Sequence, residues 1–400
     1  MAKRGNQEGS IFQRADGRWC AVVSLGWRNG KRWRKCYYGA TRDEVGRQLA
    51  SGLRDHQHGL NIAPERQTVA QFLDRWLKQC VAPTTRTNTL VSYSATVRLH
   101  IKPHVGHIPL AKLSPQHVQA MVNDLVGSPA AAKGRRTPKG LSARTAGYAR
   151  TVLRVALNQA LAWNLVHRNA AALANPPRVE SKPIQPFSPD EARAFLTAVA
   201  GDRLEALYAA ALALGLRLGE SLGLRWEDID LDAATLTVSG QLQRVKGQGL
   251  QRVPCKTSRS RRTIPLPVTV VMALRAHRAR QLEARLLAGP RWQDKGYVFT
   301  SRHGTPIDQG LVVSRFKKVL GKAKLRDQRF HDLRHACASL LLDQGVAPRA
   351  VMETLGHSQI SLTMDTYAHV MPTMLRHVAE TMDTVLAARA PAAETPQAAS

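Results

Sequence analysis

Five prolines between residues 175 and 189 constrain the fold of this chain more than any other feature. They are Pro176, Pro177, Pro183, Pro186 and Pro189. Because proline has a fixed φ and no backbone N–H, neither a long helix nor a central strand can run through such a segment. Compact domains usually hold roughly 100 to 200 residues. The chain of 400 residues is therefore predicted to form separate domains on the two sides of a linker at residues 175–187.

The charge balance indicates the kind of partner. Lysine and arginine together number 58 against 29 aspartates and glutamates, which gives a net charge of +29. Such a surplus favours a polyanion, because each phosphate that Lys or Arg neutralises releases condensed counterions. Nucleic acid is the leading candidate. An anionic membrane is second, and no helical pattern here pairs a lipid-facing stripe with a basic opposite face strongly enough to favour it.

Neither export nor a disulfide framework is expected. The start, MAKRGNQEGSIF, lacks the apolar core of a signal peptide, and the longest apolar run, residues 206–216, is too short to span a bilayer. The five cysteines are scattered and include no Cys-x-x-Cys pair, so they are interpreted as reduced thiols. The sequence predicts a soluble, cytoplasmic protein.

Residues 1–62 are predicted to form a small three-stranded β-sheet followed by a helix. Residues 19–25 and 31–38 are strand-like around Asn29-Gly30, a dipeptide typical of a type I′ hairpin, and a helix runs from Thr41 toward Gly59. A two-stranded ribbon can enter the major groove of DNA. The basic candidates for this contact lie among aromatic residues and are Arg28, Lys31, Arg32 and Arg34. The alternative is a solvated edge whose charges only prevent aggregation.

Residues 66–174 are predicted to form a helical domain. Four segments, residues 68–78, 85–101, 114–126 and 142–165, carry apolar residues at spacings of three and four, with Thr or Ser at the cap positions. Residues 133–154 include seven basic residues and no acidic one. We interpret this run as a surface that follows a phosphate backbone, and a solvated face is the alternative. Its candidate DNA-binding residues are Lys133, Arg135, Arg136, Lys139 and Arg144.

Residues 188–386 are predicted to form a third domain, α+β and mostly helical. Ser188-Pro189-Asp190-Glu191 is a capping box with proline at the first helical position. The expected helices are residues 189–200, 203–224, 268–288, 308–323, 331–343 and 348–355, and the β-like stretches lie near residues 234–239, 250–257 and 261–266. This order does not repeat the strand–helix unit of a doubly wound sheet. Residues 387–400 are predicted to be a disordered tail.

Arg217 lies in the apolar stretch AALALGLRLGESLGLRW. A guanidinium is costly to bury there unless an anion meets it, and its planar fork matches phosphate oxygens. The alternative is an internal ion pair with Glu220, three residues further on. At this point the sequence leaves both interpretations open.

The motif HDLRH, residues 331–335, places His331, Arg334 and His335 on one face of a helix as a compact cluster of hydrogen-bond donors. Two histidines four residues apart also occur on zinc-binding helices. The zinc-protease helix, however, needs Glu directly after the first His, where this chain has Asp332. We therefore predict no metal site.

The segment ETLGHSQISLTMDTYAHV contains His357 and, ten residues later, Tyr367. A free phenol has a pKa near 10 and is a poor nucleophile at neutral pH. Adjacent arginines and an imidazole could change that. Taken singly, each of these residues is more often structural.

The order of the motifs, however, resembles the signature of the tyrosine recombinases, the phage-integrase family. Gly-Leu-Arg-x-x-Glu, a hairpin lysine, His-x-x-Arg-His, Leu-Gly-His and a final Tyr follow one another here as they do in that family. Residues 99–118 resemble the family's helical core-binding domain, and residues 1–60 resemble the arm-binding sheet of lambda-type and transposon-type integrases. Leu214 departs from the pattern, because the family more often has Thr or Ser there, and this affects only a helix contact.

The resemblance implies a site-specific DNA recombinase, an enzyme that cleaves and rejoins strands through a 3′-phosphotyrosyl intermediate without metal or other cofactor. Tyr367 would attack the scissile phosphate. Arg217 and Arg334 would bind its non-bridging oxygens, where charge accumulates in the transition state.

The remaining roles are also implied by the resemblance. His331 would act as the general base, His357 would donate a hydrogen bond to phosphate, and Lys256 would protonate the leaving 5′-oxygen. Lys246 competes with Lys256 for the last role. Supporting positions are Glu220 and His335, and further DNA-binding candidates in the lysine hairpin are Arg259 and Arg261.

The implied partner is double-stranded DNA with core and arm sites, bound by a homotetramer. An excisionase and a host DNA-bending protein are further candidates, and no membrane is involved. We expect an integrase of a phage or mobile element, acting in the bacterial cytoplasm at the nucleoid. A type IB topoisomerase-like activity and a catalytically silent DNA-binding regulator are the alternatives.

Overall fold

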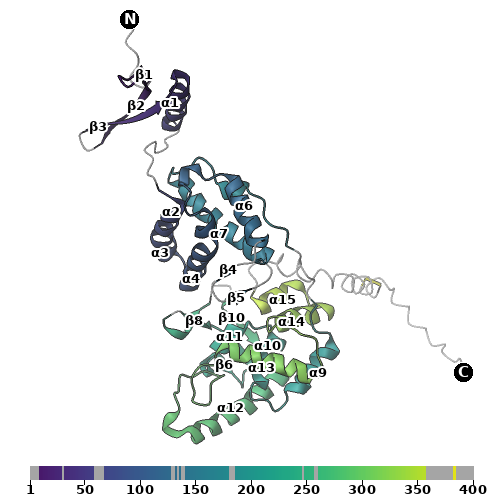
Figure 1. The fold of residues 1–400 in the computed structure, drawn as a ribbon. Coiled ribbons are helices and arrows are strands. Elements are labelled where there is room, and N and C mark those ends of the chain that lie inside the picture. Colours follow the sequence, from purple (N-terminus) through teal and green to yellow (C-terminus); the bar gives the residue numbers. More distant parts are fainter. Residues whose placement is uncertain are drawn as a thin grey trace, which may run out of the picture. The chain divides into compact units, whose positions relative to one another are not determined.

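The computed structural model describes residues 9–28, 31–57, 67–127, 131–132, 135–136, 140–179, 185–245, 247–255, 260–356 and 382–383 (Figure 1). The chain forms two compact units, Met1–Ser181 and Lys182–Ser400. Their division falls within residues 175–187, the segment in which the prolines predict a linker. The mainly helical architecture with small antiparallel sheets confirms the predicted fold class.

A three-stranded antiparallel sheet in the order β1-β2-β3 opens the described chain, and one helix follows it. The elements are β1 (Ser10–Gln13), β2 (Trp19–Arg28), β3 (Lys31–Gly39) and α1 (Arg42–Gln57). The Thr41 hydroxyl accepts a hydrogen bond from the Glu44 amide at 3.3 Å. Val45 and Leu49 of α1 pack on Ala21 and Val23 of β2, so this small sheet buries one face.

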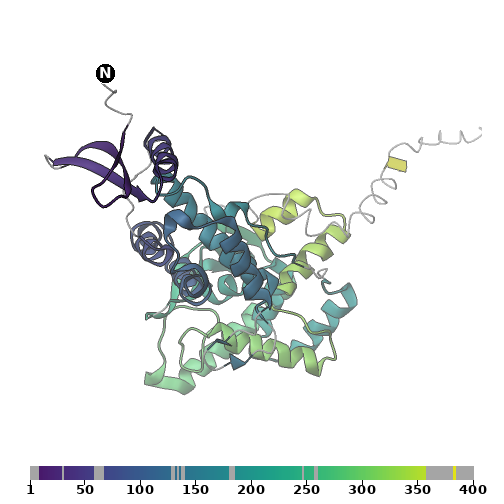
Figure 2. The same cartoon turned by 45° about the horizontal axis from the view of Figure 1, so that its top comes forward.

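The helical part of the first unit begins where its caps predict. Thr68 forms a capping box with Gln71, and the Ser142 side chain accepts from the Thr145 amide. The helices are α2 (Val69–Trp76), α3 (Ala82–Thr84), α4 (Thr87–Thr96), α5 (Lys102–Val105), α6 (Pro115–Gly127), α7 (Ala143–Ala162) and α8 (Ala170–Leu173). Figure 2 shows them gathered as a bundle drawn in blue and teal. A short pair of strands, β4 (Ala131–Ala132) and β5 (Arg135–Arg136), lies between α6 and α7, and β5 belongs to the basic run at residues 133–154.

Two of the predicted helices end later than the sequence suggested. The helix expected at residues 68–78 continues through a π-helical segment, Leu77–Val81, into α3, and that expected at residues 85–101 continues through Val97–Ile101 into α5. A π-helical segment inserts a residue into the helical turn. In both cases the extension keeps apolar residues in the core, because Val81, Ile101 and Val105 are buried.

The second unit packs its helices and strands around a large hydrophobic core, and a smaller cluster lies between α14 and α15. Its helices are α9 (Pro189–Val199), α10 (Glu205–Leu214), α11 (Leu218–Gly223), α12 (Val268–Ala288), α13 (Gln309–Lys322), α14 (Asp332–Asp343) and α15 (Pro348–Leu355). Its strands are β6 (Ile229–Asp230), β7 (Thr235–Val238), β8 (Gly240–Val245), β9 (Gly249–Pro254) and β10 (Arg262–Pro265). One sheet has the order β10-β7-β6, and β8 pairs with β9 as a hairpin. The predicted capping box at Ser188 is present.

The sequence-based prediction was wrong about one helix of this unit. The predicted helix at residues 203–224 is two helices, because Gly215 ends α10 in the left-handed conformation with φ of 60°. Glycine adopts that conformation without the steric cost that other residues incur. Strands β6 and β8 were not predicted, and they pair with the predicted β7 and β9. The break at Gly215 matters because it places Arg217 at a helix start.

Candidate active site

Arg217 precedes α11 and does not lie inside a continuous helix, which corrects the sequence interpretation. Its Nη1 donates to Glu220 Oε1 at 2.7 Å, and its backbone amide donates to Glu220 Oε2 at 3.2 Å. The internal ion pair that competed with phosphate binding therefore forms. Even so, 37% of the Arg217 side chain is exposed. The guanidinium is thus both fixed by Glu220 and accessible to an anion.

Glu220 is shared with a second arginine that the sequence analysis did not select. Arg262, the first residue of β10, donates from Nη2 to Glu220 Oε2 at 3.0 Å, and the two side chains are 7% and 5% exposed. Burial by itself would raise the pKa of the Glu220 carboxyl. The charges of Arg262 and Arg217 and their hydrogen bonds outweigh that effect and lower the pKa. Glu220 is therefore a carboxylate at neutral pH.

Arg334 lies in the first turn of α14 and is buried, with 2% of its surface exposed. Nη1 donates to the carbonyl oxygen of Gly215 and Nη2 to that of Leu355, each at 2.7 Å. These carbonyls end α10 and α15, where the negative ends of the helix dipoles favour a cation. The Arg334 guanidinium is thus held by two carbonyls and is far less exposed than that of Arg217.

His331 and His335 meet at the start of α14. Their ring centroids are 5.1 Å apart with the planes nearly perpendicular. His331 is exposed as a residue, yet its ring is desolvated by the elements around it. Desolvation, followed by the positive charges of His335, Arg334 and Arg217, lowers the pKa of His331 to about 4. At neutral pH the imidazole is therefore neutral, which is the form that accepts a proton.

His335 is also shifted toward its neutral form. Desolvation is the main cause of its lowered pKa, and the nearby carboxylate of Asp332 opposes the shift. Asp332 itself receives hydrogen bonds from the backbone and side chain of Arg329, at 2.7 Å from both the amide and Nη2. The structure thus brings Arg217, His331, Arg334 and His335 into one electrostatic neighbourhood.

The other predicted catalytic residues, Lys256, His357 and Tyr367, lie outside the described residues, as does the alternative Lys246. The chain next to two of them is described. Cys255 precedes Lys256, and Glu220 is among the groups that raise the pKa of its thiol, after desolvation. Gly356 precedes His357 and ends α15 with φ of 68°. Lys256 and His357 therefore follow directly on residues that lie beside Glu220 and Arg262.

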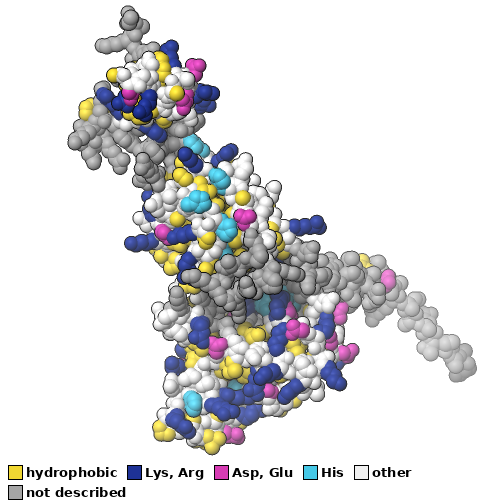
Figure 3. Space-filling view, in the orientation of Figure 1, with side chains coloured by type: hydrophobic (Ala, Val, Ile, Leu, Met, Phe, Trp, Pro, Cys, Tyr) yellow, Lys and Arg dark blue, Asp and Glu magenta, His cyan; other side chains and the backbone are white. Residues whose placement is uncertain are grey.

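Three of the predicted DNA-binding side chains are described, and all are exposed. Arg34 lies on β3, Arg144 in the first turn of α7, and Arg261 directly before β10. The backbones of Arg28, Lys31, Arg32, Arg135 and Arg136 lie in strands, but their side chains are outside the described residues, as are Lys133, Lys139 and Arg259 entirely. Figure 3 shows Lys and Arg side chains spread over the visible surface of both units.

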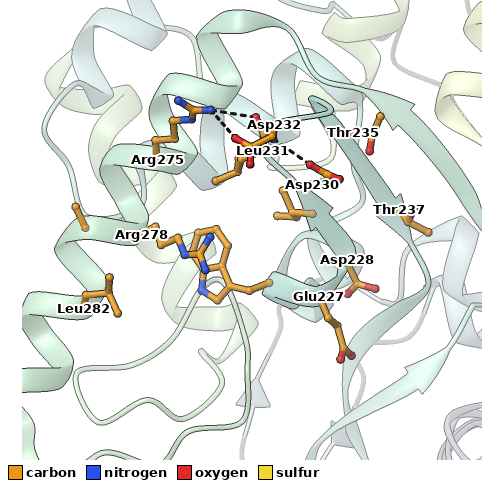
Figure 4. A pocket seen from close by; sticks show the side chains of 13 residues that line it. Glu227, Asp228, Asp230, Leu231, Asp232, Thr235, Thr237, Arg275, Arg278 and Leu282 are labelled. Carbon is orange, nitrogen blue, oxygen red and sulfur yellow. Dashed lines mark hydrogen bonds and ion pairs between the residues drawn. The ribbon is translucent and has the colours of Figure 1, made fainter.

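An open groove of about 710 Å³ lies away from these residues, between α12 and the loop before β7 (Figure 4). None of the predicted site residues that the structure describes lines it. Its walls include both carboxylates, such as those of Asp230 and Asp232, and the arginines Arg275 and Arg278, and Arg275 is already paired with Asp232 at 3.1 Å. We do not assign the DNA chemistry to this groove, because the predicted site residues that are described lie elsewhere.

Arg262 is the buried group that sequence reasoning missed, although a signal was present. It lies two residues before Ile264, whose side chain is buried, and alternate residues of a strand share one face. The pattern Arg-Thr-Ile-Pro therefore directs Arg262 toward the interior with Ile264. Without that step, Arg262 is one more arginine in a basic segment.

None of the described helices is long and apolar enough to cross a membrane. Among the same residues, no three His, Cys, Asp or Glu side chains cluster so that they could hold a metal ion.

Comparison with known sequences identifies the family. The sequence model of the phage integrase family matches residues 186–374, and that of the phage integrase N-terminal SAM-like domain matches residues 68–126. A tyrosine recombinase XerC-like protein of Caldanaerobacter subterraneus is 32% identical over 89% of this chain and 93% of its own length. An integrase of Streptomyces ambofaciens is 30% identical over 96% of this chain and 98% of its own.

Solved structures have the same fold. The Tn1549 transposon integrase in complex with a circular intermediate DNA has a TM-score of 0.65 at 21% identity, over 79% of this chain and 99% of that one. A lambda integrase tetramer bound to a Holliday junction has a TM-score of 0.52 at 17% identity, over 91% and 96%. Given a near full-length relative at 32% identity and the two matching domain models, the chain belongs to the phage integrase family of tyrosine recombinases, which are enzymes of site-specific DNA recombination.

Proposed function

We propose that this recombinase integrates and excises a phage or another mobile element through a covalent 3′-phosphotyrosyl intermediate. The observation that carries the proposal is the shared neighbourhood of Arg217 with His331 and Arg334, which lie more than a hundred residues further along the sequence. Two guanidiniums and a neutral imidazole are the groups that a metal-independent phosphoryl transfer needs around the phosphorus.

The reaction exchanges one phosphodiester for another. The Tyr367 hydroxyl attacks the scissile phosphorus while His331 takes its proton, and the bond to the 5′-oxygen breaks as Lys256 protonates that oxygen. The products are a 3′-phosphotyrosyl link and a free 5′-hydroxyl. A 5′-hydroxyl from a second duplex then reverses these steps. The number of phosphoester bonds stays constant, so the exchange requires no ATP.

Charge grows on the non-bridging oxygens as the nucleophile adds, and Arg217 and Arg334 are proposed to bind them there, with His357 as a further donor. The 37% exposure of the Arg217 side chain supports its access to a phosphate. Removal of a single donor of this kind costs on the order of 10² to 10³ in rate, and loss of the acid or base roughly 10² to 10⁴. Glu220 and His335 are assigned to orient these groups.

The other parts of the chain are proposed to select and assemble the DNA. Residues 1–62 would bind arm sites, residues 66–174 core sites, residues 188–386 would carry the chemistry, and four protomers would act together. The DNA contacts of the structural relatives support this assembly. Exposed Arg34 and Arg144 are consistent with DNA contact by the first two parts. An excisionase and a host bending protein would set the direction at the nucleoid.

The decisive experiment traps the covalent intermediate. Suicide DNA that carries the element's own end sequence, taken from the DNA beside the gene, is incubated with the full chain and run on a denaturing gel. The wild type should give an adduct, and Tyr367→Phe should bind the same DNA and give none. An adduct that persists in the Phe variant removes Tyr367 from its role. Relaxation of a plasmid without that sequence would favour the topoisomerase alternative, and DNA binding without any wild-type adduct would favour the silent regulator.

A further inference from the structure

Arg262 contacts three segments, each of which leads to a proposed catalytic residue. Nη2 binds Glu220 Oε2 at 3.0 Å, Nε donates to the Thr354 carbonyl at 2.7 Å, and Nη1 donates to the Ser260 carbonyl at 3.2 Å. Glu220 in turn fixes Arg217. Thr354 lies three residues before His357, and Ser260 lies four residues after Lys256.

The packing around Arg262 explains the glycine of the Leu-Gly-His motif. A Cβ added at Gly356 would come within 3.0 Å of Arg262 Nη1 and 3.1 Å of its Cδ, and Gly356 has φ of 68°. Glycine fits this position best, because any other residue would be strained at this φ and its Cβ would require the Arg262 side chain to shift. The guanidinium therefore packs against Gly356, the residue directly before His357.

Arg262 and Arg334 together fix the C-terminus of α15. Arg262 Nε binds the carbonyl of Thr354, and Arg334 Nη2 binds the carbonyl of the next residue, Leu355. The last carbonyls of a helix have no partner within that helix and need one outside it. The two guanidiniums therefore fix the position of the C-terminal end of α15.

We propose that Arg262 is a positioning residue for the strand-cleavage reaction. It orients Arg217 through Glu220, and it orients the end of α15 at Gly356, the residue before His357, through Thr354. The inference rests on the function proposed above. A planar guanidinium is required, because its three nitrogens donate in three directions at once, whereas a lysine ammonium keeps the charge without that fork. Misplacement of a catalytic group by about 1 Å can cost roughly 10²-fold in rate.

The test measures the single-turnover rate constant of adduct formation on saturating suicide DNA for Arg262→Lys and Arg262→Met. Arg349→Met is the matched control, because Arg349 on α15 pairs with Glu353 at 2.7 Å while 71% of its side chain is exposed. Both Arg262 variants should lose about 10²-fold in the rate constant at unchanged DNA affinity, and the control should equal the wild type. The rate constant is per bound and folded molecule, so a loss of folded protein lowers only the amplitude.

A double-mutant cycle separates positioning from general structural support. If Arg262 acts through Arg217, then Arg262→Lys should cost far less in an Arg217→Ala background than in the wild type. A wild-type rate constant in Arg262→Lys, or an equal fold loss in both backgrounds, overturns the inference and leaves the proposed function standing. Absence of any adduct from the wild type overturns the proposed function, and the inference falls with it.

Discussion

The carboxylate of Glu220 is the single negative charge between two guanidiniums, and its neutralisation gives the sharpest test of this arrangement. In Glu220→Gln the shape is kept, but one of the two arginines must then face an amide that donates. Arg217 has 37% of its side chain exposed and can turn toward water, whereas Arg262 has 7% and cannot. Most of the cost should therefore come from a buried, uncompensated Arg262.

Removal of one partner from a buried ion pair typically costs 3–5 kcal/mol. Because only one of the two arginines is deeply buried, we expect the lower end, about 3 kcal/mol, in the free energy of unfolding of the second unit. Glu353→Gln is the control. Its pair with Arg349 is exposed, with side-chain exposures of 63% and 71%, and such pairs contribute about 0.3–0.5 kcal/mol.

This free energy can be measured by hydrogen exchange of the full chain. Mass spectrometry of the peptides that cover α11 and β10 reports it for the segments that contain Glu220 and Arg262. The pH dependence supplies a second check. The folded pKa of Glu220 is lowered, so its contribution is complete above the ordinary glutamate pKa of about 4.3 and is lost as the pH falls through the folded pKa. The difference in the free energy of unfolding between wild type and variant should therefore be constant near neutral pH and become smaller below about pH 4.3. A difference under about 1 kcal/mol at pH 7 would refute the assignment of Glu220 as the counterion of Arg262.

Two further predictions concern the same neighbourhood. In a denaturation assay, Gly356→Ala should lower the free energy of unfolding by about 1–2 kcal/mol, because the residue has φ of 68° and the new Cβ contacts Arg262. Gly321→Ala in α13 is the control, because open space surrounds that position, and it should be neutral or stabilising. The second-order rate constant of adduct formation should stay constant as the pH falls from about 7.5 to about 5.5, because the pKa of His331 is lowered to about 4 in the DNA-free chain. A decrease of this rate constant with a midpoint near pH 6.5 would contradict the prediction.

Local signals in the sequence predicted the element boundaries that depend on neighbouring residues alone. Ser188 and Thr68 cap helices where they were expected to, because a capping box is a contact within four residues. The break at Gly215 was missed for the opposite reason. A glycine inside an apolar helix costs only about 1 kcal/mol, and here contacts from distant segments end the helix. Arg334 binds the Gly215 carbonyl, and a Cβ at Gly215 would lie 2.3 Å from Leu355.

The functional site also combines features that the sequence predicts with features that only the packing of distant segments determines. Arg217, His331 and Arg334 could be selected because a family motif names them, and the structure places them in a common neighbourhood, while their catalytic roles stay a prediction. The accessibility of each guanidinium could not be foreseen. Sequence spacing does not reveal that Arg334 is buried against two carbonyls while Arg217 stays partly exposed. Both facts depend on how α10, α14 and α15 meet.

The charge balance of the described site relates this packing to the proposed chemistry. Three guanidiniums, those of Arg217, Arg262 and Arg334, are balanced by one carboxylate, Glu220, while the lowered pKa values of His331 and His335 keep both rings neutral. Asp332 is compensated by Arg329. The described groups therefore carry two more positive than negative charges. Carbonyls at the ends of α10 and α15 accept hydrogen bonds from Arg334 and Arg262. In the proposed reaction, a phosphodiester with one negative charge becomes a pentavalent state with two, while His331 takes the phenol proton and becomes a further cation. The described groups would therefore gain positive charge as the phosphate gains negative charge, and interactions that strengthen in the transition state are the ones that accelerate a reaction.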